Sequence, residues 1–210
     1  MKYKIILASN SPRRKELLAG LDFPFEVRVM QGIDESFPDT LNAYDTALYI
    51  ARKKADAYQS LLEEGDDNLL VLTADTVVIA PSDGFLNDQE CKGVILGKPH
   101  DAEEAYSMLR MLSGKTHHVV TGVCLTTREL QRQFSVVTEV SFKNLHEQEI
   151  NYYVDHYKPF DKAGAYGIQE WIGYIGITSI RGSYYNVMGL PVQRIYEELR
   201  KMPKSHGSER

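Results

Sequence analysis

Apolar runs and amphipathic stretches alternate along most of the chain, which predicts strands and helices in turn. The run at 69–80, LLVLTADTVVIA, is almost wholly apolar and rich in β-branched residues. Such a run is typical of a strand covered on both faces in a parallel or mixed sheet, so we expect it to be the central strand. Other strands are predicted at 4–8, at 117–127 and 134–143 as a hairpin, and at 174–180.

Helices are predicted where apolar residues recur every three or four positions. They cover 12–20, 43–58, 101–113, 147–157 and 191–202. The third is the clearest, because Asp101 caps it with Glu104 three residues further on, and Gly114 ends it. The segments 59–68 and 81–93 are polar or rich in turn-forming residues, and we expect both to be loops.

Helices interleaved with parallel and antiparallel strands predict the α/β class with a mixed sheet. The length of 210 residues is enough for one large domain with a sizeable core. No internal repeat, low-complexity tract or clear linker divides the sequence. We therefore expect a single, two-lobed domain over residues 1–202, followed by a disordered tail at 203–210.

The composition argues against several classes of protein. Hydrophobic residues make up 43% of the chain and charged residues 25%, as in ordinary globular proteins. The net charge of −5 and the pI near 5.7 disfavour nucleic acid as a partner, so any positive site must be local. No apolar run has the length of a membrane span, and we expect a cytoplasmic protein without membrane contact. Cys91 and Cys124 lie far apart and are interpreted as free thiols.

The segment LASNSPRRKELL is the most informative for chemistry. Ser9 and Ser11 follow a predicted strand, and Arg13 and Arg14 lie in the first turn of a predicted helix. Free backbone N–H groups at a helix N-terminus attract anions, and two arginines there add forked donors suited to phosphate oxygens. The alternative is a serine-capped surface helix with solvated arginines, and spacing alone does not decide between the two.

Carboxylates provide the second signal. Asp75 lies inside the apolar strand, where a buried carboxylate needs a metal, an arginine or a shifted pKa. A structural salt bridge is the alternative. Asp34 and Glu35 in QGIDES would ordinarily be a solvated turn, but together with Asp75 they could supply the oxygen ligands that Mg²⁺ takes while it bridges phosphates.

Other polar residues are weaker candidates. Lys54 and Lys98 could bind phosphate or be solvated, and Gln169 could contact a base edge or simply be solvated. Thr76 is a hydroxyl donor with no specificity of its own. The SGKT tetrad at 113–116 is not a phosphate-binding loop, because it ends a helix and lacks the preceding glycine. The sequence also contains no HExxH or GxSxG motif and no cysteine and histidine spacing typical of zinc sites.

The assembled motifs resemble those of the Maf family of nucleoside triphosphate pyrophosphatases, also called septum-formation-inhibitor-like proteins. The matching blocks occur in family order, from Ile5 to Leu199: LASNSPRR, GIDES, KKA, TADTVV, LGKPHD, MLSGKTHHVVTGV, DKAGAYGIQ and GSYYNVMGLP. The resemblance implies the fold shared with inosine-triphosphate pyrophosphatases, with a cleft between two lobes. It also implies a divalent metal, Mg²⁺ or Mn²⁺, a nucleoside triphosphate substrate and a homodimer.

The resemblance also implies roles for individual residues. Asp75 takes the place of the catalytic proton acceptor, and Glu35 that of the metal helper, with Asp34 beside it and Asp75 as a further ligand. The phosphate-binding positions fall on Ser9, Ser11, Arg14, Lys54 and Lys98. The specificity positions fall on Arg13, Thr76 and Gln169, as in the branch that prefers dTTP and UTP.

The implied reaction releases pyrophosphate from pyrimidine nucleoside triphosphates and so limits the incorporation of unwanted nucleotides. The alternative is a nucleotide-binding regulator of cell division that acts through protein contacts.

Overall fold

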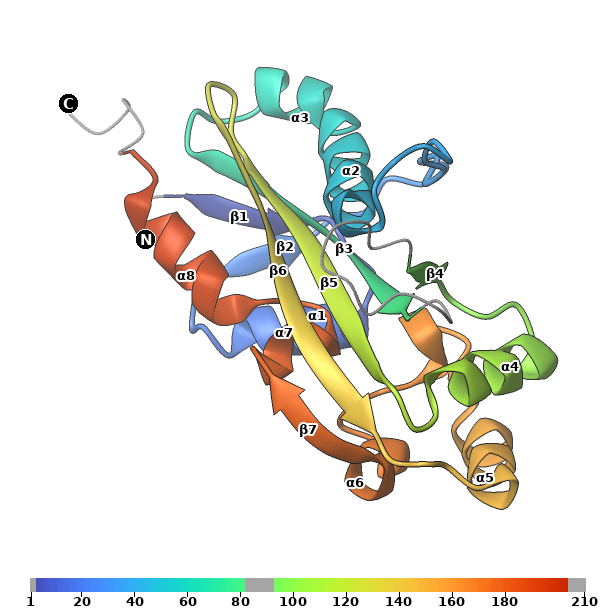
Figure 1. Cartoon of the computed structure of the whole chain (residues 1–210). Helices are drawn as coiled ribbons and strands as arrows, with labels where there is room; N and C mark the ends of the chain where they lie inside the picture. The colour runs from blue at the N-terminus through green and yellow to red at the C-terminus, as the bar shows by residue number, and fades with distance from the viewer. Residues whose placement is uncertain (1–2, 82–92, 204–210) are drawn as a thin grey trace.

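The computed structural model describes residues 3–81 and 93–203, and within them the strands form a single mixed sheet (Figure 1). The sheet has the order β2-β1-β3-β5-β6-β7, and β4 pairs with β3 outside this path. The strands are β1 (Lys4–Leu7), β2 (Phe25–Val27), β3 (Leu69–Ala80), β4 (Val94–Leu96), β5 (Thr116–Thr126), β6 (Gln131–Phe142) and β7 (Ile177–Arg181).

Strand β3 is the interior strand that its apolar run predicts. It pairs in parallel with β1, which in turn pairs in parallel with β2. On its other edge β3 pairs antiparallel with β5, and β5, β6 and β7 continue antiparallel. The predicted α/β class with a mixed sheet is therefore confirmed.

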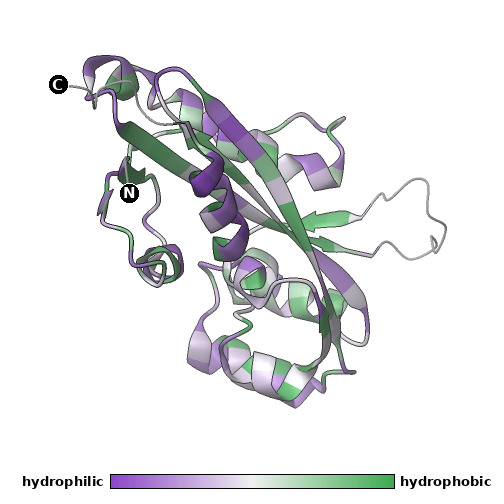
Figure 2. Cartoon of the chain, turned by 90° about the vertical axis from the view of Figure 1, so that its left-hand side faces the viewer, coloured by the Kyte–Doolittle hydropathy of each residue, from purple (hydrophilic) through white to green (hydrophobic). Residues whose placement is uncertain are grey.

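One edge of β3 changes partners halfway along the strand. Strand β1 follows β3 only as far as Leu72, and β4 joins it only from Val78. Among the described residues, the stretch 73–77 therefore has a neighbouring strand only on the β5 side. Figure 2 shows the hydrophobic ends of β3 and β4 beside each other where β4 takes over this edge. The gap between the two partners leaves the backbone edge around Asp75 without a neighbouring strand on this side.

Eight α-helices and one short 3₁₀ helix lie in the described residues. They are α1 (Pro12–Ala19), α2 (Ala43–Asp56), α3 (Gln59–Glu64), α4 (Ala102–Leu112), α5 (Glu147–Tyr157), η1 (Ala163–Ala165), α6 (Trp171–Gly176), α7 (Tyr184–Met188) and α8 (Val192–Lys201). The five predicted helices are confirmed as α1, α2, α4, α5 and α8. Asp101 caps α4 as expected, because its side chain accepts a hydrogen bond from the Glu104 N–H at 2.8 Å.

Helices cover both faces of the sheet. On β3, Thr73 and Val77 face α2, whereas Ala74 packs in the cluster that contains Leu18 of α1 and Ile195 of α8. A second large cluster packs α4, α5 and α6 against the other end of the sheet, with Leu109, Ile150 and Ile172 in its core. Figure 1 shows this separation, with α4, α5 and α6 near one end of β5 and β6 and α8 toward the other. Successive residues of β3 thus face opposite layers.

Two predicted segments are wrong in detail. The segment 59–68 is not entirely a loop, because α3 forms there and buries Leu62 beside Tyr58. The predicted strand at 174–180 begins only at Ile177, because its first residues complete helix α6.

Several expectations concern residues that the structure does not describe. Cys124 is a free, buried thiol, as expected, whereas Cys91 and most of the predicted loop at 81–93 lie outside the described residues. The same holds for residues 204–210 of the predicted tail. Within the described residues, no helix combines the length and the apolar character that crossing a membrane would require.

Candidate active site

A pocket of about 480 Å³ lies at the unpaired edge of β3. Its walls come from the loop after β1, the segment 29–35, helix α2, strand β3 and the segments 161–169 and 187–189. Every predicted site residue except Asp34 lines it, namely Ser9, Ser11, Arg13, Arg14, Glu35, Lys54, Asp75, Thr76, Lys98 and Gln169. Residues far apart in the sequence thus meet because β1 and β4 leave this edge open.

The loop between β1 and α1 brings polar groups into the pocket. Ser9 accepts a hydrogen bond from the Ser11 N–H at 3.2 Å, and Ser11 caps the helix by accepting from the Arg14 N–H at 3.4 Å. Pro12 fits the first helical turn because it has no N–H to leave unpaired there. The first turn contains no acidic residue, so the partial positive charge of the helix N-terminus is not neutralised within the helix.

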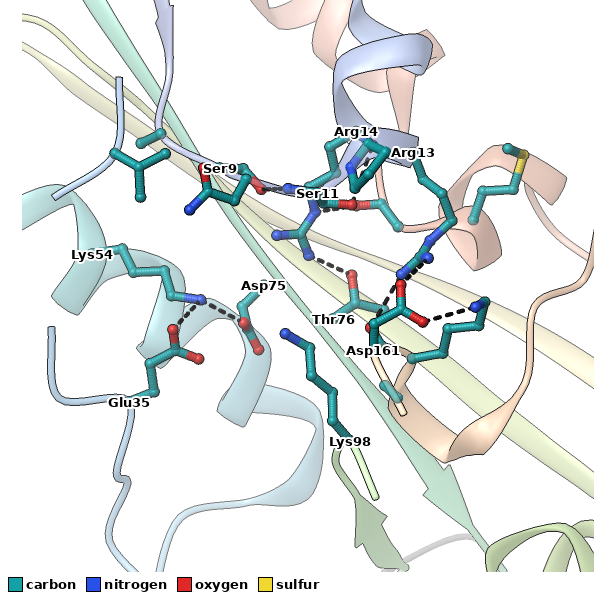
Figure 3. Close-up of a pocket in the computed structure, with 18 of the residues that line it drawn as sticks. Ser9, Ser11, Arg13, Arg14, Glu35, Lys54, Asp75, Thr76, Lys98 and Asp161 are labelled. Carbon is teal, nitrogen blue, oxygen red and sulfur yellow. Dashed lines mark hydrogen bonds and ion pairs between the residues drawn. The ribbon is translucent and has the colours of Figure 1, made fainter. Parts of the chain in front are cut away.

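Asp75 and Lys54 form the most enclosed ion pair of the pocket. The Lys54 Nζ lies 2.8 Å from Asp75 Oδ1 and 3.0 Å from Glu35 Oε1, and the side chains of Lys54 and Asp75 are each only 14% exposed. Figure 3 shows Lys54 between the two carboxylates. The two acids therefore converge on one cationic group.

Gly122 allows helix α2 to bring Lys54 to this position. It pairs with Asp75 across β3 and β5, and the backbone of α2 lies directly over it. A Cβ atom at Gly122 would lie 2.3 Å from the Leu48 nitrogen and 2.5 Å from the Ala47 carbonyl carbon. Any larger residue would thus separate the helix from the strand.

Asp34 does not join this pair. Its carboxylate lies 2.8 Å from Lys53 Nζ and accepts hydrogen bonds from the backbone N–H and the hydroxyl of Ser36. These contacts hold the pKa of Asp34 well below its usual range, with the Lys53 hydrogen bond as the largest cause. Of the two neighbouring acids, the structure brings only Glu35 to Asp75 and Lys54.

Arg14 is half-buried and binds the protein itself. Its Nε donates to the Gly189 carbonyl at 2.8 Å, Nη1 to the Ala74 carbonyl at 2.8 Å and Nη2 to the Thr76 hydroxyl at 3.0 Å. Burial lowers the pKa of Arg14, while the neighbouring Asp75 acts in the opposite direction. Arg14 thus connects β3 to the end of α7. Because a guanidinium has five N–H donors, two of them remain for other partners.

Arg13 is held by a residue that the sequence did not single out. Its Nη1 lies 2.7 Å from Asp161 Oδ2, and Lys162 Nζ lies 2.8 Å from the other oxygen of the same carboxylate. Burial raises the pKa of Asp161, but Lys162 and Arg13 outweigh it and bring it to about 2. The DKAGAYGIQ motif places Asp161 and Lys162 in the pocket, but nothing in the isolated sequence indicates their partner.

Two further residues that line the pocket have polar groups without a partner among the described residues. Among the described residues, Gln169 has a buried Oε1 that accepts no hydrogen bond. Lys98 forms no hydrogen bond or ion pair within the same part of the chain, and Figure 3 shows its amino group directed toward Asp75. The unpaired, buried Oε1 of Gln169 is costly unless a ligand satisfies it. Lys98 is exposed, so water solvates its ammonium, which is available to an anionic ligand.

The carboxylates of the pocket fit a metal that a substrate helps to hold. In the part of the chain that the structure describes, no group of three or more His, Cys, Asp or Glu residues is arranged around a metal position. Asp75 and Glu35, however, already face one cation, the Lys54 ammonium. Mg²⁺ is commonly bound by one or two carboxylates together with substrate phosphates. Asp75 and Glu35 therefore provide the type and number of protein ligands that such a site needs.

Comparison with known proteins gives a consistent picture. The family model described as Maf-like protein matches residues 4–202. A protein of Phocaeicola vulgatus named dTTP/UTP pyrophosphatase is 57% identical over 201 residues, which cover 96% of this chain and 97% of the relative. A protein with the same name from Parabacteroides distasonis is 56% identical over 95% of this chain and 96% of its own length. Another from Porphyromonas gingivalis is 53% identical over 98% of this chain and 97% of its own length.

Proposed function

The chain belongs to the Maf family, and we propose on this premise that it hydrolyses dTTP and UTP to the nucleoside monophosphate and pyrophosphate. Relatives that are 53–57% identical over nearly the whole chain are named for this activity. The observation that carries the proposal is the convergence of Asp75, Lys54 and Glu35 in a single pocket with the residues expected to bind phosphates and base.

Asp75 is the proposed proton acceptor. A water molecule attacks the α-phosphorus and gives its proton to the Asp75 carboxylate, while the bond from the α-phosphorus to the bridging oxygen breaks and its electron pair leaves with pyrophosphate. Lys54 holds Asp75 Oδ1 at 2.8 Å and so fixes the direction of the carboxylate. The positions of Asp75 and Lys54 are fixed in turn by the close approach of α2 to Gly122.

The phosphates are proposed to lie between the N-terminus of α1 and the lysines. The Ser9 and Ser11 hydroxyls, the positive end of α1 and the backbone N–H of Arg13 are suited to phosphate oxygens. The other N–H groups of the first turn are not available, because Pro12 has none, Ser11 caps that of Arg14 and that of Lys15 donates to the Ser11 carbonyl. Lys98 supplies a positive charge that no described protein group uses, and Arg14 has two donors left after its three internal contacts. Such groups mainly position the chain of phosphates and stabilise its charge, which is most of what phosphoryl transfer requires.

Asp75 and Glu35 are the proposed protein ligands of Mg²⁺ or Mn²⁺, together with phosphate oxygens of the substrate. When bound there, the metal would neutralise phosphate charge and lower the pKa of a coordinated water. The binding of Lys53 and Ser36 to Asp34 favours Glu35 over Asp34 in this role.

Arg13, Thr76 and Gln169 are proposed to contact the base. The buried, unpaired Oε1 of Gln169 supports this role, because it would gain a partner when a base donor binds. Asp161 keeps Arg13 in place through the ion pair at 2.7 Å. A pocket with such buried polar groups can reject a wrong base strongly, since the mismatch leaves these groups unpaired.

Chromatography of the products tests the proposed reaction. The purified protein, with Mg²⁺ or Mn²⁺, is incubated with dTTP, UTP, CTP, ATP, GTP, ITP and 7-methyl-GTP. We expect monophosphate and pyrophosphate from dTTP and UTP first of all. Formation of orthophosphate and the nucleoside diphosphate would show that a different bond is cleaved and would overturn this part of the proposal. A preference for another base would overturn the proposed specificity.

The alternative of a division regulator predicts that no nucleotide is hydrolysed with either metal, and the names of the relatives favour the enzyme. The homodimer, the cytoplasmic location and the single domain over 1–202 stay predictions.

A further inference from the structure

A buried chain of hydrogen bonds leads from the pocket to helix α7. The Thr76 hydroxyl oxygen lies 2.9 Å from that of Thr121 on β5, and the Thr121 hydroxyl lies 3.2 Å from the backbone carbonyl of Asn186. Thr121 and Asn186 are completely buried, whereas Thr76 lines the pocket. Water therefore has access only to the Thr76 end of this chain.

The two ends of this chain determine the direction of its hydrogen bonds. Arg14 can only donate, so the Thr76 oxygen accepts at 3.0 Å from its guanidinium. The Asn186 carbonyl can only accept, so the Thr121 hydroxyl donates to it. With its own hydrogen used in this way, Thr121 accepts the hydrogen of Thr76.

The reverse direction is poorer by one hydrogen bond. If Thr121 donated to Thr76 instead, the Asn186 carbonyl would lose its bond from Thr121, and the hydrogen of Thr76 would point into the pocket without a protein acceptor. The loss of one hydrogen bond makes the reverse arrangement roughly fivefold less populated than the first.

Asn186 is itself held rigidly. Its side-chain Nδ2 lies 3.1 Å from the Val119 carbonyl, the Val136 carbonyl and the Thr138 hydroxyl. These contacts on β5 and β6 leave the Asn186 backbone little freedom to turn its carbonyl away from Thr121. The end of the hydrogen-bond chain is thus set by the sheet and does not depend on the ligand.

We propose that Thr121 and Asn186 are positioning residues that present the Thr76 oxygen to the pocket as a hydrogen-bond acceptor only, and so select bases with an N–H donor at N3. The inference rests on the proposed function. Uracil and thymine both carry this imide N3–H, whereas cytosine has a lone pair at N3. An acceptor facing that lone pair would be repelled and left unpaired, which is how a polar pocket discriminates.

Three variants test the inference through the ratio of kcat/KM for UTP to that for CTP. Thr121→Val keeps the branched shape in β5 but removes the hydroxyl that accepts from Thr76. The Thr76 hydrogen is then free to turn into the pocket, and we expect the ratio to fall about fivefold. Thr121→Ser retains a hydroxyl and should keep a ratio within about twofold of the original.

Thr73→Val is the matched control. Thr73 is a completely buried threonine on the same strand as Thr76, and its hydroxyl donates to the Ala51 carbonyl of α2 at 2.7 Å, with no contact to Thr76. Its loss should lower stability, as in Thr121→Val, but should leave the UTP to CTP ratio unchanged. A second measurement needs no variant: the original protein should also reject UTP methylated at N3.

The outcomes separate this inference from the proposed function. An equal ratio for Thr121→Val and the original protein would overturn the inference, as would an equal fall in Thr73→Val or rapid hydrolysis of N3-methylated UTP. In each of these cases the hydrolysis of UTP would still support the proposed function. Failure to hydrolyse any nucleotide would instead overturn the proposed function.

Discussion

Replacing Gly122 with alanine should push helix α2 away from the sheet. This would displace Lys54 from Asp75, although Gly122 itself is not expected to contact the substrate. The added Cβ would lie 2.3 Å from the Leu48 nitrogen, 2.4 Å from its Cα and 2.5 Å from the Ala47 carbonyl carbon. All three are backbone atoms, so no side chain can rotate to make room. The helix as a whole must move.

The size of the effect follows from these contacts. Non-bonded atoms prefer separations of about 3.5 Å, so α2 must shift by roughly 1 Å at this point. Overpacking of this kind costs about 1–3 kcal/mol, which for a chain of this size lowers Tm by roughly 2–12 °C. Lys54, which lies further along the same helix, would move relative to Asp75. Misplacement of a reacting group by about 1 Å can cost up to ~100-fold in rate.

Urea denaturation and UTP hydrolysis measure the two parts of this prediction. Gly20→Ala is the control, because Gly20 follows α1 with an ordinary φ of −65° and a Cβ there would approach no atom closer than 3.4 Å. We expect Gly122→Ala to lose both stability and kcat, and Gly20→Ala to retain both. If Gly122→Ala unfolded at the original urea concentration and kept the original kcat, the reasoning about α2 would be refuted.

Two other substitutions test internal contacts by urea denaturation. Arg14→Lys should lower the free energy of unfolding by about 2–4 kcal/mol, because an ammonium cannot reach the three acceptors that guanidinium binds; a higher KM with unchanged stability would contradict this. Burial, and secondarily His118, lowers the pKa of His117 to about 3, so only the unfolded chain takes up this proton between pH 6.5 and 3. The free energy of unfolding should therefore decrease as the pH is lowered from 6.5 to 3. His117→Gln should reduce the slope of this free energy against pH by up to ~1.4 kcal/mol per pH unit. Equal slopes for the variant and the original protein would argue against a neutral His117.

Long, strongly patterned elements could be predicted from the sequence, whereas short ones could not. The apolar run at 69–80 defines β3, and helical spacing defines the five longer helices. The sequence does not predict helix α3, because only Leu62 of its six residues is buried, which is too few to produce a helical period. Strands β2 and β4 have three residues each, and α6 reads as a strand because its sequence is apolar.

For the site, the sequence indicates which residues gather but not what each one binds. Asp75 is recognisable as a carboxylate in an apolar strand, and it does lie in the pocket. No pattern distinguishes Asp34 from Glu35, because their difference arises from Lys53, which is on another element. Similarly, the internal contacts of Arg14 depend on Gly189, which is 175 positions away in the chain. These partners become visible only when the chain is folded.

The comparison of Asp75→Asn with the original protein tests the central claim most directly. The measurement is kcat for UTP together with the dissociation constant of UTP in the presence of Mg²⁺, obtained by calorimetry. Asp66→Asn provides the same chemical change at an exposed aspartate, which pairs with Lys4 outside the pocket. We predict that Asp75→Asn still binds UTP but loses about 10²–10⁴-fold in kcat, as expected for removal of a proton acceptor, while Asp66→Asn retains the original rate. A kcat for Asp75→Asn equal to that of the original protein would contradict the account.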